Sequence, residues 1–264
     1  MDKKISYKNK SVSYRVIGQG NPVVFLHGFA EDKEIWARQV KVLENNYQLL
    51  IPDLPGSGGS ESTGDVSMDA MADTIKYILN EESISETILI GHSMGGYVSI
   101  AFADKYPESL KALGFFHSSS YADTEEKKLT RKKNFAFIQK NGSHAFLQQS
   151  TPGLFSEASK MAFPGIVESV IEGNKDFGAG ALADYQLAMM ERPDRREVLT
   201  NIVKPVLFII GEHDSAIPFK DSMEQCHLPA LSYIHVLKQS GHMGMLEETE
   251  KSNHILQNFL SDTL

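Results

Sequence analysis

The chain has 264 residues, of which 41% are hydrophobic and 23% charged, a composition typical of a globular protein with a buried core. Its net charge of −8 argues against nucleic-acid binding, which requires basic patches. Cys226 is the only cysteine, the first ten residues lack the apolar core of a signal peptide, and no apolar run approaches the ~20 residues of a membrane span. The composition therefore predicts a soluble, cytoplasmic protein with neither a nucleic-acid nor a membrane partner.

The first 116 residues alternate between strand and helix patterns. Ser11 to Ile17 alternates polar and apolar residues, as a half-buried strand does. Continuous apolar runs, typical of strands buried on both faces, follow at residues 23–26, 49–51, 87–90 and 110–116. Helical patterns lie between them at residues 35–43, from a Ser67 cap onward, and from Gly95. This alternation predicts a parallel sheet with helices on both faces.

The alternation stops after Phe116 and resumes near residue 203. The intervening stretch shows no buried strand; a helix is predicted to start at Asp123 with Glu126 and to end at Asn141-Gly142. Strands at 205–210 and 233–237 then alternate with helices at 219–226 and 248–260. We therefore expect a core domain of residues 1–117 and 203–264, interrupted by a helical insertion at residues 118–202.

A candidate nucleophile lies where the third of the apolar runs ends. Residues 91–95 read Gly-His-Ser-Met-Gly, between a predicted strand and a predicted helix. This G-x-S-x-G pattern forms a sharp turn. The turn has no room for side chains beside the serine, and the two glycines have none. The pattern predicts that Ser93 is exposed at the edge of the sheet as a nucleophile.

A serine hydroxyl needs a base, and the base needs an acid that orients it. In this architecture the acid and then the histidine should follow later strands. Asp214 follows the strand at 205–210, and His242 follows the strand at 233–237. Two other carboxylates compete with Asp214: Glu212, two residues away, and Asp123, just after the strand at 110–116. We favour Asp214 as the acid and His242 as the base.

Acyl transfer also needs backbone N–H donors that hold the developing oxyanion. One should belong to Met94, the residue after the nucleophile, and the other to the loop after an early strand. Residues 26–29, Leu-His-Gly-Phe, occupy that position, and the N–H of Phe29 is the second candidate. His27 is expected to brace this loop.

Five motifs occur in the order found in one large family: HGF at 27–29, DLPGSGGS at 53–60, GHSMGG at 91–96, GEHDSAIP at 211–218 and SGHMGMLE at 240–247. On these residues the chain resembles the α/β hydrolase fold superfamily along nearly its whole length. The resemblance implies an eight-stranded, mostly parallel sheet with a helical cap inserted after the sixth strand. Ser57 departs from the histidine of many relatives, in a loop that does no proton chemistry.

The combined reading is a serine hydrolase that cleaves a small, largely apolar carboxylic ester or related acyl compound. No metal-ligand cluster, P-loop or G-x-G-x-x-G motif is found, so no metal or other cofactor is expected. The resemblance also covers carbon–carbon bond hydrolases, lyases, perhydrolases and receptors that retain the triad, and the fold does not choose among them. Epoxide hydrolases and dehalogenases are disfavoured, because those relatives carry aspartate at the position of Ser93.

Overall fold

The computed structural model describes residues 1–264. Eight strands form one sheet in the order β1-β2-β4-β3-β5-β6-β7-β8. The strands are β1 (Asp2–Tyr7), β2 (Lys10–Ile17), β3 (Asn21–Leu26), β4 (Tyr47–Pro52), β5 (Thr87–His92), β6 (Leu110–Phe116), β7 (Val206–Gly211) and β8 (Ser232–Leu237). The pairs β1–β2 and β2–β4 are antiparallel and all others are parallel. The prediction of a mostly parallel, eight-stranded sheet is confirmed.

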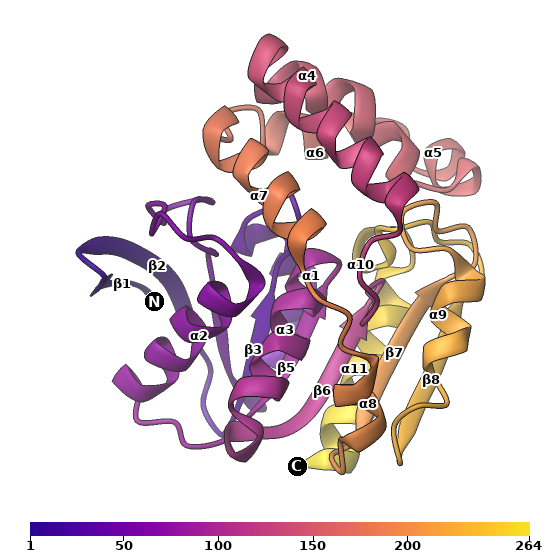
Figure 1. The fold of residues 1–264 in the computed structure, drawn as a ribbon. Helices are drawn as coiled ribbons and strands as arrows, with labels where there is room; N and C mark the ends of the chain where they lie inside the picture. The colour runs from indigo at the N-terminus through magenta and orange to yellow at the C-terminus, as the bar shows by residue number, and fades with distance from the viewer.

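Helices cover both faces of the sheet (Figure 1). One face packs on α2 (Met68–Glu81), α3 (Met94–Lys105) and α8 (Arg196–Asn201), and α9 (Phe219–Gln225) follows β7. The other face packs on α1 (Ala37–Leu43), α10 (Gly244–Glu247) and α11 (Thr249–Thr263). Every residue of β5 and β7 is buried, as their uninterrupted apolar sequences predict. None of the helices combines the length and the hydropathy needed to cross a bilayer.

The first strand is one element that the sequence patterns did not indicate. In β1 every second residue is exposed, because β1 lies at the edge of the sheet and only one of its faces packs on the protein. It pairs with β2 through a tight turn in which Lys8 and Asn9 both have positive φ, at 51° and 61°. Such a turn matches the twist of a hairpin. Its first position is usually Asn, Asp or Gly, so Lys there does not indicate a hairpin in the sequence.

Between β6 and β7 the chain contains only helices, which lie over one edge of the sheet in Figure 1. They are α4 (Glu125–Ser150), α5 (Glu157–Ala162), α6 (Ile166–Gly173) and α7 (Ala179–Glu191), followed by α8, which returns to pack on α3. The helix predicted to end at Asn141-Gly142 is interrupted there: Gly142 has φ 84° and ψ 170°, and α4 resumes beyond it.

The start of α4 differs from the prediction by its capping residue. Thr124, rather than Asp123, accepts the hydrogen bond from the N–H of Lys127. The physical reason is charge: the carboxylate of Asp123 is buried and turned toward two arginines, so it is not available to cap the helix.

Candidate active site

The turn after β5 holds Ser93 in a strained conformation. Ser93 has φ 49° and ψ −113°, a region that costs a non-glycine residue on the order of 1–3 kcal/mol. Its N–H donates to the carbonyl of Phe116, and its own carbonyl accepts from the Ser118 hydroxyl at 2.7 Å. A Cβ on Gly95 would lie 2.5 Å from the carbonyl oxygen of Leu26. The turn therefore packs directly on the end of β3, and only glycine fits at position 95.

Asp214 and His242 are brought together from loops that follow β7 and β8. The Nδ1–H of His242 donates to Oδ2 of Asp214 at 2.8 Å. The other oxygen, Oδ1, accepts from the backbone N–H groups of Ala216 and Ile217 at 2.8 and 2.9 Å. Because both oxygens of the carboxylate are occupied, its orientation toward His242 is fixed. This contact also sets the tautomer of His242, leaving Nε2 with the free lone pair.

Burial and the neighbouring groups shift the pKa of Asp214 in opposite directions. Burial raises the pKa of the carboxyl, but the charge of His242 and hydrogen bonds from His117 and His242 lower it well below its usual value. His117 is fully buried, and its Nδ1 lies 3.4 Å from Oδ2 of Asp214. Burial lowers the pKa of His117, more than the hydrogen bond and charge of Asp214 raise it, so its ring is neutral. Asp214 therefore remains ionised.

The two predicted oxyanion donors are the backbone N–H groups of Phe29 and Met94. Phe29 follows β3, which pairs with β5, and Met94 is the first residue of α3. Neither N–H donates to a backbone carbonyl. His27 braces the loop of Phe29: its Nδ1 lies 2.8 Å from the Gly28 carbonyl, and its Nε2 accepts from the N–H of Leu54 at 2.9 Å.

A cavity of about 200 Å³ lies at the Ser93 turn, and Phe29 is among the residues that line it. Ser93 and His242 both line it, although no hydrogen bond joins the serine hydroxyl to the imidazole. The remaining lining residues come from the loop after β3, from β5 and α3, from α4, the short 3-10 helix after it and α7 of the insertion, and from the loop after Asp214: Phe29, Glu31, His92, Tyr97, Arg131, Asn134, Phe146, Ser150, Leu154, Gln186, Met189, Ala216 and Ile217. The wall is thus mixed: seven of its 15 residues are hydrophobic, and the others are polar or charged.

A buried pair, Glu31 and His92, links three loops of the site. His92 Nδ1 lies 2.9 Å from Oε2 of Glu31, and that same oxygen accepts from the N–H of Gly28 at 2.6 Å. On its other side, His92 Nε2–H donates to the backbone carbonyl of His242 at 3.0 Å. Burial opposes both charges, but the mutual attraction raises the pKa of His92 and lowers that of Glu31, so the pair is ionic.

We expect Glu31→Gln to lower the free energy of unfolding by about 1–3 kcal/mol, because it leaves the His92 cation without its partner. The raised pKa of His92 stabilises the fold fully below its usual value of 6.5, and this contribution is lost as pH rises through the folded value. The lowered pKa of Glu31 stabilises the fold above 4.5, and this is lost as pH falls through the folded value. Thermal melts of wild type and variant should therefore differ most between these two values.

The matched control is Glu34→Gln, which removes a carboxylate of an exposed pair with Arg15. An exposed pair is worth only about 0–1 kcal/mol, so its effect should be small. A melting difference for Glu31→Gln that is the same at every pH, from acid to strongly alkaline solution, would contradict the ionic assignment.

The two rival carboxylates lie away from His242. Glu212 is exposed at the end of β7. Asp123 is buried and pairs with Arg131 and with Arg192, whose Nη1 lies 2.8 Å from its Oδ1. Neither forms a hydrogen bond with the imidazole. Of the three carboxylates considered, only Asp214 does so.

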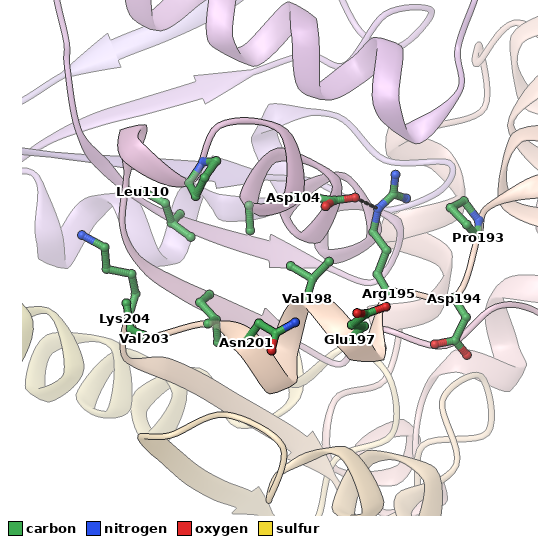
Figure 2. A pocket seen from close by; sticks show the side chains of 13 residues that line it. Asp104, Leu110, Pro193, Asp194, Arg195, Glu197, Val198, Asn201, Val203 and Lys204 are labelled. Carbon is green, nitrogen blue, oxygen red and sulfur yellow. Dashed lines mark hydrogen bonds and ion pairs between the residues drawn. The ribbon is translucent and has the colours of Figure 1, made fainter.

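A second and larger cavity, of about 640 Å³, lies elsewhere on the molecule (Figure 2). It is bounded by the end of α3, the start of β6, and the segment containing α8, and Arg195 is paired there with Asp104. No serine, histidine or cysteine lines it. The smaller cavity at Ser93 is therefore the chemically equipped one, in spite of its size.

Sequence reasoning missed several side chains of the site. His92 and His117 were not among the predicted site residues; both are buried, and both hydrogen-bond within the site. Glu31 and Arg131 were not predicted as site residues either. The signal that could have identified Glu31 is its place two residues after Phe29, in a loop where a carboxylate would be buried.

A family model described as alpha/beta hydrolase fold matches residues 21–137. Among curated proteins, Lipase 1 of Psychrobacter immobilis is 24% identical over 254 residues, covering 85% of this chain and 78% of the lipase. The pimeloyl-[acyl-carrier protein] methyl ester esterase of Vibrio vulnificus strain YJ016 is 25% identical over 256 residues, covering 92% of this chain and 95% of that protein.

Among solved structures, a thermophilic esterase from Thermogutta terrifontis superposes with a TM-score of 0.94 at 26% identity, covering 100% of this chain and 99% of that one. The family model and these neighbours confirm the resemblance that the five motifs indicated.

Proposed function

This protein has the α/β hydrolase fold, and on that premise we propose that it is a serine hydrolase that cleaves a small carboxylic ester through an acyl-enzyme intermediate. One observation carries the proposal: the 2.8 Å contact between His242 and Asp214 at the wall of the cavity into which Ser93 opens. The strained turn at Ser93 supports it, because strain of this kind concentrates at reactive positions. The lipase and esterases among the similar proteins agree with ester hydrolysis.

In the proposed mechanism the Ser93 hydroxyl attacks the ester carbonyl while Nε2 of His242 takes its proton. Asp214 stabilises the imidazolium that results. The N–H groups of Phe29 and Met94 hold the oxyanion of the tetrahedral intermediate. When the intermediate collapses, His242 returns the proton to the leaving alcohol, and Ser93 keeps the acyl group. A water molecule deprotonated by His242 then attacks the acyl-enzyme, releasing the acid and restoring Ser93.

The volume of the cavity limits the size of the substrate. The cavity volume of about 200 Å³ is below the ~300–1,000 Å³ of pockets that hold drug-sized ligands. A short acyl or alcohol group fits such a space better than a long chain. The insertion supplies part of the wall through Phe146 and Met189, so we propose that residues 118–202, and α4 to α7 in particular, act as a cap over the core domain. The cytoplasmic location stays a prediction.

The test is turnover of short-chain p-nitrophenyl esters by the purified protein and by Ser93→Ala. We expect hydrolysis by the wild type and loss of it in the variant. Hydrolysis that persists in Ser93→Ala would refute the proposal. Labelling of Ser93 by a fluorophosphonate without turnover of any ester would instead favour a receptor that retained the triad.

A further inference from the structure

Three charged side chains meet where the insertion closes the cavity: Asp123 before α4, Arg131 on α4 and Arg192 directly after α7. Asp123 pairs with Nε of Arg131 through Oδ2 and with Nη1 of Arg192 through Oδ1. All three side chains are largely buried, with 0%, 16% and 4% of their surfaces exposed. One carboxylate thus faces two guanidinium groups, and the cluster carries an excess positive charge inside the protein.

The guanidinium of Arg131 is only partly satisfied by the protein. Its Nε and Nη2 are directed to Asp123, whereas Nη1 has only Oε1 of Gln186 at 3.5 Å and Sδ of Met189 at 3.3 Å. The first distance is at the limit for a hydrogen bond, and a thioether is a weak acceptor. Arg131 lines the same cavity as Ser93 and His242. A guanidinium with free donors is therefore available to whatever occupies the cavity.

Arg192 lies behind this group and is held in place. Its guanidinium stacks 3.9 Å above the ring of Tyr97, which lines the cavity, and its Nη1 donates to the carbonyl of Met189. Its Nε is buried without any hydrogen-bond partner. Arg192 is therefore held by Tyr97, Met189 and Asp123, and no second carboxylate pairs with Arg131 or Arg192.

The other acidic group in the cavity does not balance this charge. Glu31 lines the cavity, but His92 and the N–H of Gly28 already bind its carboxylate. Asp214 does not line the cavity, and its carboxylate accepts from His242 and two backbone N–H groups rather than from either arginine. A buried unpaired charge is costly, and an anion in the cavity would offset that cost while accepting hydrogen bonds from Arg131.

We propose that Arg131 forms an anion subsite of the catalytic cavity, so that the preferred substrate is a small ester that also carries a carboxylate. This inference rests on the proposed ester hydrolysis and narrows its substrate class. Planar, forked guanidinium donors match a carboxylate well, and the small cavity requires the ester and the carboxylate to be a few carbons apart. Half-esters of short dicarboxylic acids fit that description.

The experiment compares kcat/KM for monoethyl succinate, glutarate and adipate with neutral esters in which an isopropyl group replaces the carboxylate. The wild type should prefer the half-ester at one or more of these lengths. Arg131→Gln should lower the ratio of half-ester to neutral-ester kcat/KM by on the order of 10- to 100-fold, the cost of losing one partner of a desolvated pair. Arg131→Lys should restore part of the preference.

The control is Lys132→Gln, which removes the same charge from the next position of α4, on the exposed face. It should leave both activities unchanged. No preference for any half-ester, or an equal loss of both activities in Arg131→Gln, would overturn the subsite and leave Ser93-dependent hydrolysis intact. If no ester is hydrolysed, calorimetry with glutarate still tests the anion subsite. Binding to the wild type that is lost in Arg131→Gln supports the subsite, and absence of binding to the wild type refutes it.

Discussion

Replacing Ser93 by alanine should lower kcat for ester hydrolysis by on the order of 10⁶, replacing His242 should cost about as much, and the double variant should lose little more. The physical reason is that the two side chains act in one step. The imidazole accelerates the reaction only by taking the proton of the Ser93 hydroxyl, so removing either group removes the same contribution. Steady-state kinetics on one p-nitrophenyl ester, with all three variants purified in parallel, measures this.

Additive losses would contradict the shared step, because they would mean that Ser93 and His242 contribute independently. Folding must be checked by thermal melts. Alanine has a Cβ, as serine does, so it is under the same backbone strain at φ 49°. The Ser93→Ala variant should therefore melt close to the wild type. His242→Ala also removes the partner of Asp214, so a modest fall in its melting temperature is expected.

A large loss of kcat is also expected when Asp214, the carboxylate that orients His242, is replaced. Asp214→Asn should lower kcat by on the order of 10⁴, because an amide can donate to Nδ1 of His242 and hold the ring in the wrong tautomer. Asp123→Asn should have a far smaller effect on kcat, since Asp123 pairs with arginines and makes no contact with His242. The same ester assay on both variants separates the two carboxylates.

Glu212→Gln is the matched control, because Glu212 lies two residues from Asp214 and is exposed. It should retain wild-type kcat. If Asp123→Asn abolishes turnover while Asp214→Asn retains it, the assignment of the acid is wrong, despite the 2.8 Å contact.

Much of the fold could be predicted because the central strands are simple to recognise. Strands buried on both faces must be apolar throughout, so β5 and β7 are visible as uninterrupted runs. The edge strand β1 was missed because it packs on one face only and its sequence is largely polar. The start of α4 was misplaced at Asp123, because a local capping rule cannot foresee that a carboxylate will be claimed by arginines 8 and 69 residues further along the chain.

In the site, too, features set by local sequence could be predicted, and features set by contacts between distant residues could not. Residues that follow parallel strands meet at one sheet edge, which is why Ser93, Asp214 and His242 could be named from the sequence. His117 and Glu31 could not, since each acts through a partner distant in sequence: His117 lies beside Asp214, and Glu31 pairs with His92. Arg131 was not predicted either, because the basic residues beside it are exposed and only the packing of α4 on α7 turns it inward.

The most direct test of the account is to trap the covalent intermediate. The protein is mixed with a p-nitrophenyl ester, quenched in acid within the first turnover and digested, and its peptides are weighed by mass spectrometry. The proposed mechanism predicts that the peptide containing Ser93 gains the mass of the acyl group, and that more of this peptide is acylated when His242 is intact. Acylation of a different residue, or rapid turnover with no acyl group on any peptide, would contradict it.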